Sequence, residues 1–164
     1  MIRPLPLKSL KFPILCFNQN LVLIEENESD LSSCGAGALK NGWFEKMIII
    51  DSEMKYVSVA YAKKLCGIGP FWGYRIFRTQ RIKIELFIKE EPKKVQVNCV
   101  KGKVFQSFKK WHGWSSRDDF DELNRRMQEA QSFQEIIQIL KGPVLVVSGR
   151  SKGTISGRNV VPFG

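Results

Sequence analysis

The sequence has few of the residues that metal sites and disulfide frameworks require. It contains one histidine, His112, and four cysteines that are far apart and form no CxxC pair: Cys16, Cys34, Cys66 and Cys99. Zinc sites and disulfide-rich folds need such residues in number and at close spacing. We therefore expect no metal and no cofactor, and we interpret the cysteines as reduced, mostly buried thiols of a cytoplasmic protein.

Long apolar runs are also missing. No window approaches the roughly 18 uninterrupted apolar residues that a membrane span needs. Residues 1–24 contain Pro4, Pro6 and Pro13 among scattered lysines and have no small-residue cleavage site, so they do not resemble a secretory signal. These absences predict a soluble protein without a membrane partner.

Acidic residues are absent from both ends of the chain. The 164 residues carry a formal net charge of +10, of which residues 1–12 contribute three and residues 141–164 contribute four. The remaining body has an excess of only three positive charges. The high net charge is therefore a property of the ends and does not by itself indicate a nucleic-acid-binding body.

Length and an apolar content of 43% predict one domain with its own core. Pro4, Pro6 and Pro13 lack an amide donor, and each disfavours helical backbone in the residue before it. Residues 1–12 are therefore expected to form an extended basic arm. Residues 148–164 are rich in glycine, serine and bases, which predicts a disordered basic tail. We expect residues 13–147 to form the domain, and the arm and tail to be dispensable for its folding.

The clearest pattern lies between Gly67 and Ile88. The apolar positions from Ile82 to Ile88 alternate with Lys83 and Glu85, which is typical of a strand with one buried and one solvated face. Such strands belong to antiparallel sheets. Phe87 is the exception, because it is an aromatic residue on the polar face.

The other segments complete an α+β fold in which an antiparallel sheet has the C-terminal helices packed on one face. Gly102 leaves a strand at 95–99 as the alternative to a helix there. Capping-box spacing begins at Ser116 and Ser132. The expected strands lie within 13–24, 47–50, 55–59 and 144–147, the helices at 27–40, 95–111, 117–130 and 133–140, a turn at 51–54, and a short helix or loop at 60–66.

No catalytic constellation emerges. His112 lies between two tryptophans and lacks a partner at an informative spacing. The glycine-rich segment 67–73 lacks the lysine and Ser/Thr of a P-loop. The carboxylates within 118–122 fall in the first turn of an expected helix, where the helix dipole favours negative charge. We therefore expect that the chain is not an enzyme.

A basic aromatic run is the best candidate for a binding site. Arginine makes planar, bidentate contacts to carboxylates or phosphates, and aromatic rings provide stacking or anchoring area. Protein and nucleic acid partners both fit this chemistry, and the alternative is that the rings belong to the core. The candidate partner-binding residues are Trp72, Tyr74, Arg75, Phe77, Arg78 and Arg81.

Basic and acidic residues are separated along the body of the chain, residues 13–140. We expect the lysines within 101–110 to extend the basic side of this run, whereas residues 118–135 form an acidic region. A surface with separated charges suits docking to a complementary protein.

In its size, its cysteine usage and its lack of a catalytic constellation, the chain resembles the small cytoplasmic immunity-type inhibitors encoded beside bacterial toxins. This resemblance is one of kind and assigns no residues. It implies a non-enzymatic protein-binding module that inhibits a toxin. The alternative is a nucleic-acid-binding module that uses the basic aromatic stretch 72–83, and an enzyme ranks third.

Overall fold

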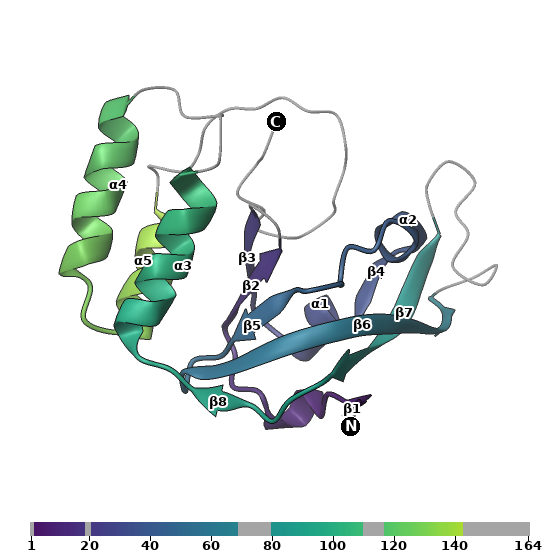
Figure 1. Cartoon of the computed structure of the whole chain (residues 1–164). Coiled ribbons are helices and arrows are strands. Elements are labelled where there is room, and N and C mark those ends of the chain that lie inside the picture. The colour runs from purple at the N-terminus through teal and green to yellow at the C-terminus, as the bar shows by residue number, and fades with distance from the viewer. Residues whose placement is uncertain (1, 19–20, 69–79, 110–116, 143–164) are drawn as a thin grey trace.

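The computed structural model describes residues 2–18, 21–68, 80–109 and 117–142, and it has an α+β fold (Figure 1). Within these ranges the strands are β1 (Arg3–Pro4), β2 (Ile14–Asn18), β3 (Leu21–Glu25), β4 (Ser33–Gly35), β5 (Ile48–Ile50), β6 (Lys55–Gly67), β7 (Arg81–Ile88) and β8 (Lys93–Lys94). The helices are η1 (Leu7–Ser9, a 3₁₀ turn), α1 (Glu28–Leu31), α2 (Ala36–Lys40), α3 (Val97–Lys109), α4 (Arg117–Glu129) and α5 (Phe133–Lys141).

All strands belong to one antiparallel sheet in the order β1-β7-β6-β5-β2-β3, with β4 paired to β7 and β8 paired to β6. The long strand β6 connects the two parts of the sheet. Its residues Tyr56–Ser58 pair with β5, and its residues Val59–Gly67 pair with β7. The sheet class expected from the sequence is confirmed.

The sheet supports two separate hydrophobic cores. The first lies between β2, β3 and β5 and the three C-terminal helices, and it contains Leu15, Phe17 and Ile136. The second lies on the opposite face and contains Ile14, Cys16 and the buried residues of β7. Because β2 and β3 are buried on both faces, their sequences are nearly continuous apolar runs.

The C-terminal helices cover only one part of the sheet. Figure 1 shows α3, α4 and α5 beside β2 and β3 at one end, and β7, β4 and α2 at the other. The expected packing of these helices on one face is thus confirmed. On the face of β6 that points away from the second core, Tyr56 packs against the first core and lies under Lys103 of α3, whereas no residue of β7 belongs to the first core.

Strand β7 has the alternation that its sequence predicts. Ile82, Ile84, Leu86 and Ile88 are at most 2% exposed and face the second core. Lys83 is exposed, while Phe87 lies on the outer face and stacks on Tyr61 with 4.7 Å between ring centroids.

The single helix expected at 27–40 is wrong. Asn27 does cap a helix, since its side chain accepts the N–H of Asp30 at 3.1 Å, but that helix ends at Leu31. Residues Ser33–Gly35 then form β4 and pair with Arg81–Lys83 of β7. Sheet pairing at this edge outweighs the weak helical pattern of a segment with two glycines.

The short helix or loop expected at 60–66 is also wrong, because β6 continues to Gly67. Here the backbone pairs with β7, and irregularities interrupt the register between Val59 and Tyr61 and between Lys64 and Cys66. Such bulges break the period-two pattern by which a strand is recognised.

The predicted hairpin at 47–59 is confirmed, and Asp51 organises its turn. The side chain of Asp51 is completely buried and accepts backbone N–H groups from Glu53 at 3.0 Å and Lys55 at 2.8 Å. It also accepts the N–H of Lys11 at 3.2 Å, which joins the turn to the N-terminal segment.

The C-terminal helices form as expected, with small changes of boundary. Residues 97–109 are helical, and a Cβ at Gly102 would meet no atom within 4 Å, so no close packing requires glycine there. Ser132 caps α5 by accepting the N–H of Glu135 at 3.2 Å. The cap expected at Ser116, the strand expected at 144–147 and the tail at 148–164 lie outside the described residues.

The N-terminal segment contributes to the second core. Leu5 and Leu10 are 4% and 5% exposed, and the N–H of Leu5 donates to the carbonyl of Leu86 at 2.7 Å. Residues Arg3–Pro4 add a short strand to the edge of β7. In the described ranges, no helix is both long and apolar enough to cross a bilayer.

Candidate partner-binding surface

The strands β6 and β7 lead into and out of the basic aromatic run. Of the six candidate residues, Arg81 is the one that falls within the described residues, where it begins β7. Its guanidinium donates to the hydroxyl oxygen of Ser33 at 3.1 Å, which ties the base of the run to β4. The others lie outside the described residues: Trp72, Tyr74, Arg75, Phe77 and Arg78.

We call residues 60–68 and 80–87 the hairpin arm. Three of the four large apolar side chains that are exposed in the described ranges belong to it: Tyr61 at 39%, Leu65 at 51% and Ile68 at 39%; the fourth is Ile2. None of these three residues was predicted as a binding residue from the sequence, because the pattern at 60–66 indicated a short helix or loop and no strand. Their signal was a run of apolar residues directly before the aromatic stretch.

An aromatic pair forms the inner end of the arm's outer face. The rings of Tyr61 and Phe87 are stacked with an interplanar angle of 11°. The next pair along the strands, Ala62 and Leu86, points to the second core instead. The stacked Tyr61–Phe87 pair explains why Phe87, an apolar residue, breaks the alternation of β7. It gives the outer face of the arm an apolar base.

Cations line the rest of the arm. On the paired strands Lys63 lies opposite Glu85, and Lys83 lies opposite Cys66. Neither these two lysines nor Lys64 forms an ion pair within 4.0 Å with another described residue. Their charges are therefore available to a ligand.

One edge of the arm is open. The N–H of Val59 donates to the carbonyl of Met47 at 2.8 Å, next to the end of β5. From Tyr61 to Gly67, β6 pairs with β7 alone among the described strands. Alternate N–H and C=O groups of such a strand point away from its one neighbour and remain available for pairing.

The lysines of α3 do not extend this surface, contrary to expectation. The Lys101 ammonium donates to the carbonyl of Gln128 at 2.8 Å, and that of Lys103 lies 5.3 Å from the ring centroid of Tyr56. Both contacts are at the helical end of the molecule, whereas the arm lies at the other end (Figure 1). Burial raises the pKa of Tyr56, consistent with a structural role.

Two carboxylates of α4, Glu122 and Glu129, have structural contacts. Glu122 accepts from Arg125 at 2.8 Å, and this hydrogen bond lowers the pKa of Glu122. Arg125 also donates to Glu129 at 2.7 Å. Within the described ranges no group of three potential metal ligands occurs, and His112 lies outside them.

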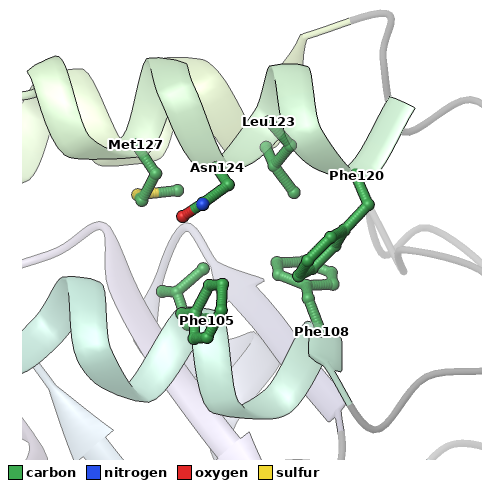
Figure 2. Close-up of a pocket in the computed structure, with 7 residues that line it drawn as sticks. Phe105, Phe108, Phe120, Leu123, Asn124 and Met127 are labelled. Atoms are coloured by element: carbon green, nitrogen blue, oxygen red, sulfur yellow. The ribbon is translucent and has the colours of Figure 1, made fainter. Parts of the chain in front are cut away.

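A hollow between α3 and α4 does not form a ligand site. Its volume is about 10 Å³, far below the several hundred Å³ of a typical small-molecule pocket. Phe105 and Phe120 close its outer side with ring centroids 5.5 Å apart. Figure 2 shows the lining side chains, which are Val104, Phe105, Phe108, Phe120, Leu123, Asn124 and Met127.

None of the four cysteines, all of which lie in the described ranges, forms a disulfide, and two of them are buried. Cys16 and Cys34 lie in the second core, whereas Cys66 on the hairpin arm and Cys99 on α3 are exposed. The expectation of mostly buried thiols is thus met for half of them. Cys66 and Cys99 therefore provide one exposed thiol for labelling at each end of the molecule.

Comparisons of the chain with protein-family models, with curated proteins and with solved structures returned no match. The guide to its function is therefore the surface just described. That surface combines exposed apolar side chains, lysines without an ion pair to a described residue, and a strand edge that no described strand covers.

Proposed function

We propose that the chain is a non-enzymatic protein-binding module that contacts its partner through the hairpin arm. The observation that supports this most is the clustering of Tyr61, Leu65 and Ile68 on eight consecutive residues. Exposed apolar groups are ordinary when scattered, but a cluster of them marks an interaction site. The aromatic and arginine residues that follow in 72–81 are the types that dominate binding hot spots.

The charges of the arm indicate what such a partner would carry. Lys63, Lys64 and Lys83 are exposed and unpaired within the described residues, while Glu85 is the only acid in 80–87. An acidic partner surface would be steered toward this end and held against it. The resemblance to immunity-type inhibitors makes a bacterial toxin encoded beside the chain the partner to test first.

Site-specific photo-crosslinking tests this proposal. Benzophenone maleimide would be attached to Cys66 in a Cys99→Ser variant, and to Cys99 in a Cys66→Ser variant as the matched control. Both labels sit on exposed thiols, one on the hairpin arm and one at the helical end. After irradiation in a lysate of the native host, we expect a discrete protein adduct from Cys66 and none from Cys99.

The adduct should also depend on the arm's side chains. Leu65→Ser should reduce its yield without reducing thermal stability, because Leu65 is half exposed and outside both cores. Equal adducts from both thiols, or a Cys66 adduct that Leu65→Ser leaves unchanged, would contradict a specific interface on the arm.

The alternative is a nucleic-acid-binding module, which the unpaired lysines of the arm favour. Fluorescence anisotropy with single- and double-stranded oligonucleotides at about 150 mM salt tests it. Micromolar or tighter binding that Arg75→Ala and Arg78→Ala abolish would replace the protein-binding proposal. Its affinity should then fall with log salt at a slope of about −0.9 per phosphate contact on duplex DNA.

A further inference from the structure

We infer that the open edge of β6, from Tyr61 to Gly67, binds an extended acidic segment of the partner as an added antiparallel or parallel strand. This inference rests on the proposed function and specifies the chemistry of the ligand. Added strands obtain affinity from main-chain hydrogen bonds and specificity from alternate side chains. The edge offers both kinds of contact.

The available length is sufficient for such pairing. The regular stretch Tyr61–Lys64 gives about 13 Å of edge at about 3.3 Å per residue, and Leu65–Gly67 continue the edge beyond the irregularity between Lys64 and Cys66. The opposite edge of the same residues is held by β7 from Val59 to Gly67, so the edge is preformed. A ligand that pairs here needs to order only its own backbone.

The alternation of side chains on this edge gives a peptide two surfaces. Ala62 packs against the second core, while Tyr61 rests on Phe87 at the outer face. Exposed Leu65 follows toward the aromatic run. A strand beside β6 would place one set of alternate side chains next to Tyr61 and Lys63 on the outer face. It would place the other set next to Ala62 and Lys64, since Lys64 lies opposite Ile84.

Charge excludes the two occupants that the chain itself could supply. A second copy paired through the same edge would bring Lys63 and Lys64 of both copies together, and like charges on neighbouring strands are destabilising. The chain's own residues 143–164 carry three bases and no acid. An acidic segment from another protein is the occupant that matches the lysines.

The bulges of β6 support selectivity. Irregular pairing flanks the regular stretch Tyr61–Lys64, and bulges with edge lysines are devices that prevent indiscriminate strand pairing. The edge is therefore protected against neutral or basic strands, and it is compatible with one whose acids neutralise the lysines.

A synthetic peptide tests the inference on the full-length chain. The probe is a fluorescein-labelled peptide of about eight residues in which valine and glutamate alternate. Two matched peptides serve as controls: one with lysine in place of glutamate, and one with alternate backbone amides N-methylated. We expect binding of the acidic peptide, with each control weaker by about tenfold or more.

Matched charge variants locate the site. Lys64→Glu should weaken binding of the acidic peptide by about tenfold, whereas Lys109→Glu, the same charge change on α3, should alter it less than about twofold. Amide hydrogen exchange should slow in Tyr61–Gly67 upon binding and stay unchanged in β3. Binding that is insensitive to N-methylation, or equal losses from both variants, would overturn strand addition.

The outcome can be separated from that of the proposed function. If the Cys66 adduct forms and depends on Leu65, but neither the peptide nor the crosslinked partner slows exchange in Tyr61–Gly67, the protein interface stands and strand addition is wrong. If an oligonucleotide rather than a peptide protects these amides, both proposals fail.

Discussion

Replacing Asp51 by alanine should destabilise the protein more than any other single change in its turns. The carboxylate is fully buried and accepts the N–H groups of Lys11, Glu53 and Lys55 at 2.8–3.2 Å. It therefore fixes the β5–β6 turn and attaches the N-terminal segment to it. Ser52 adds two contacts to the same segment, since its N–H and hydroxyl both donate to the Lys11 carbonyl.

The size of the effect follows from the donors that lose their acceptor. Each N–H left without a partner in a buried place costs about 1–3 kcal/mol, and water can reach some of these partly buried groups. We estimate a loss of about 3 kcal/mol for Asp51→Ala, a large share of a typical stability of about 5–15 kcal/mol. Asp51→Asn keeps one oxygen acceptor and should lose about 1–2 kcal/mol.

Urea unfolding followed by tryptophan fluorescence measures these losses. Glu53→Ala is the matched control in the same turn, because it removes only an exposed ion pair with Lys55 and should change the unfolding free energy by less than about 1 kcal/mol. A loss below about 1 kcal/mol for Asp51→Ala, or one equal to that of Glu53→Ala, would refute the role assigned to the buried carboxylate.

Three further predictions concern packing. Ile84→Asp should unfold the protein because it places a charge in the second core, whereas Lys83→Asp on the solvated face should be nearly silent; circular dichroism distinguishes them, and similar effects would mean a wrong strand register. Leu5→Asp should lower the unfolding free energy by several kcal/mol in the urea assay, because Leu5 is buried in the second core. For the same reason, a protein without residues 1–12 should melt well below the full chain, and an unchanged melting temperature would show that the arm is dispensable for folding. The two exposed thiols should react with a maleimide in the native state and the two buried ones only in urea, as mass spectrometry would show; four equally fast thiols would contradict the assigned burial.

The local sequence pattern was sufficient to predict a helix or strand where one face of the element is buried and the other is solvated. β7 alternates at every position except Phe87, and Ser132 with Glu135 marks the start of α5, so both elements were predictable. The segment 33–35 was not, because it is a strand only by virtue of its pairing with residues 81–83, which are far away in the sequence. The second half of β6 was missed because two irregularities in its pairing break the period-two pattern.

The candidate site was predictable only in part. The arginines and rings at 72–81 lie next to the hairpin arm in the sequence, since Arg81 is the first residue of β7. Tyr61, Leu65 and Lys64 could not be recognised, because their exposure depends on which strand edge stays open and on where the C-terminal helices pack. That information is tertiary and leaves no local pattern.

The most direct test of the protein-binding claim is the affinity of the crosslinked partner for variants of the arm, measured by surface plasmon resonance with the full chain immobilised. We expect Leu65→Ser and Tyr61→Ala each to weaken binding by about tenfold, and Trp72→Ala to cost more than about 2 kcal/mol, while Lys109→Ala on α3 stays within about twofold of the wild type. Each variant must retain the wild-type unfolding free energy to within about 1 kcal/mol, so that a lost interface is not confused with a lost fold. Undiminished affinity in Leu65→Ser, Tyr61→Ala and Trp72→Ala would contradict the assignment of the hairpin arm and the adjoining aromatic run as the interface.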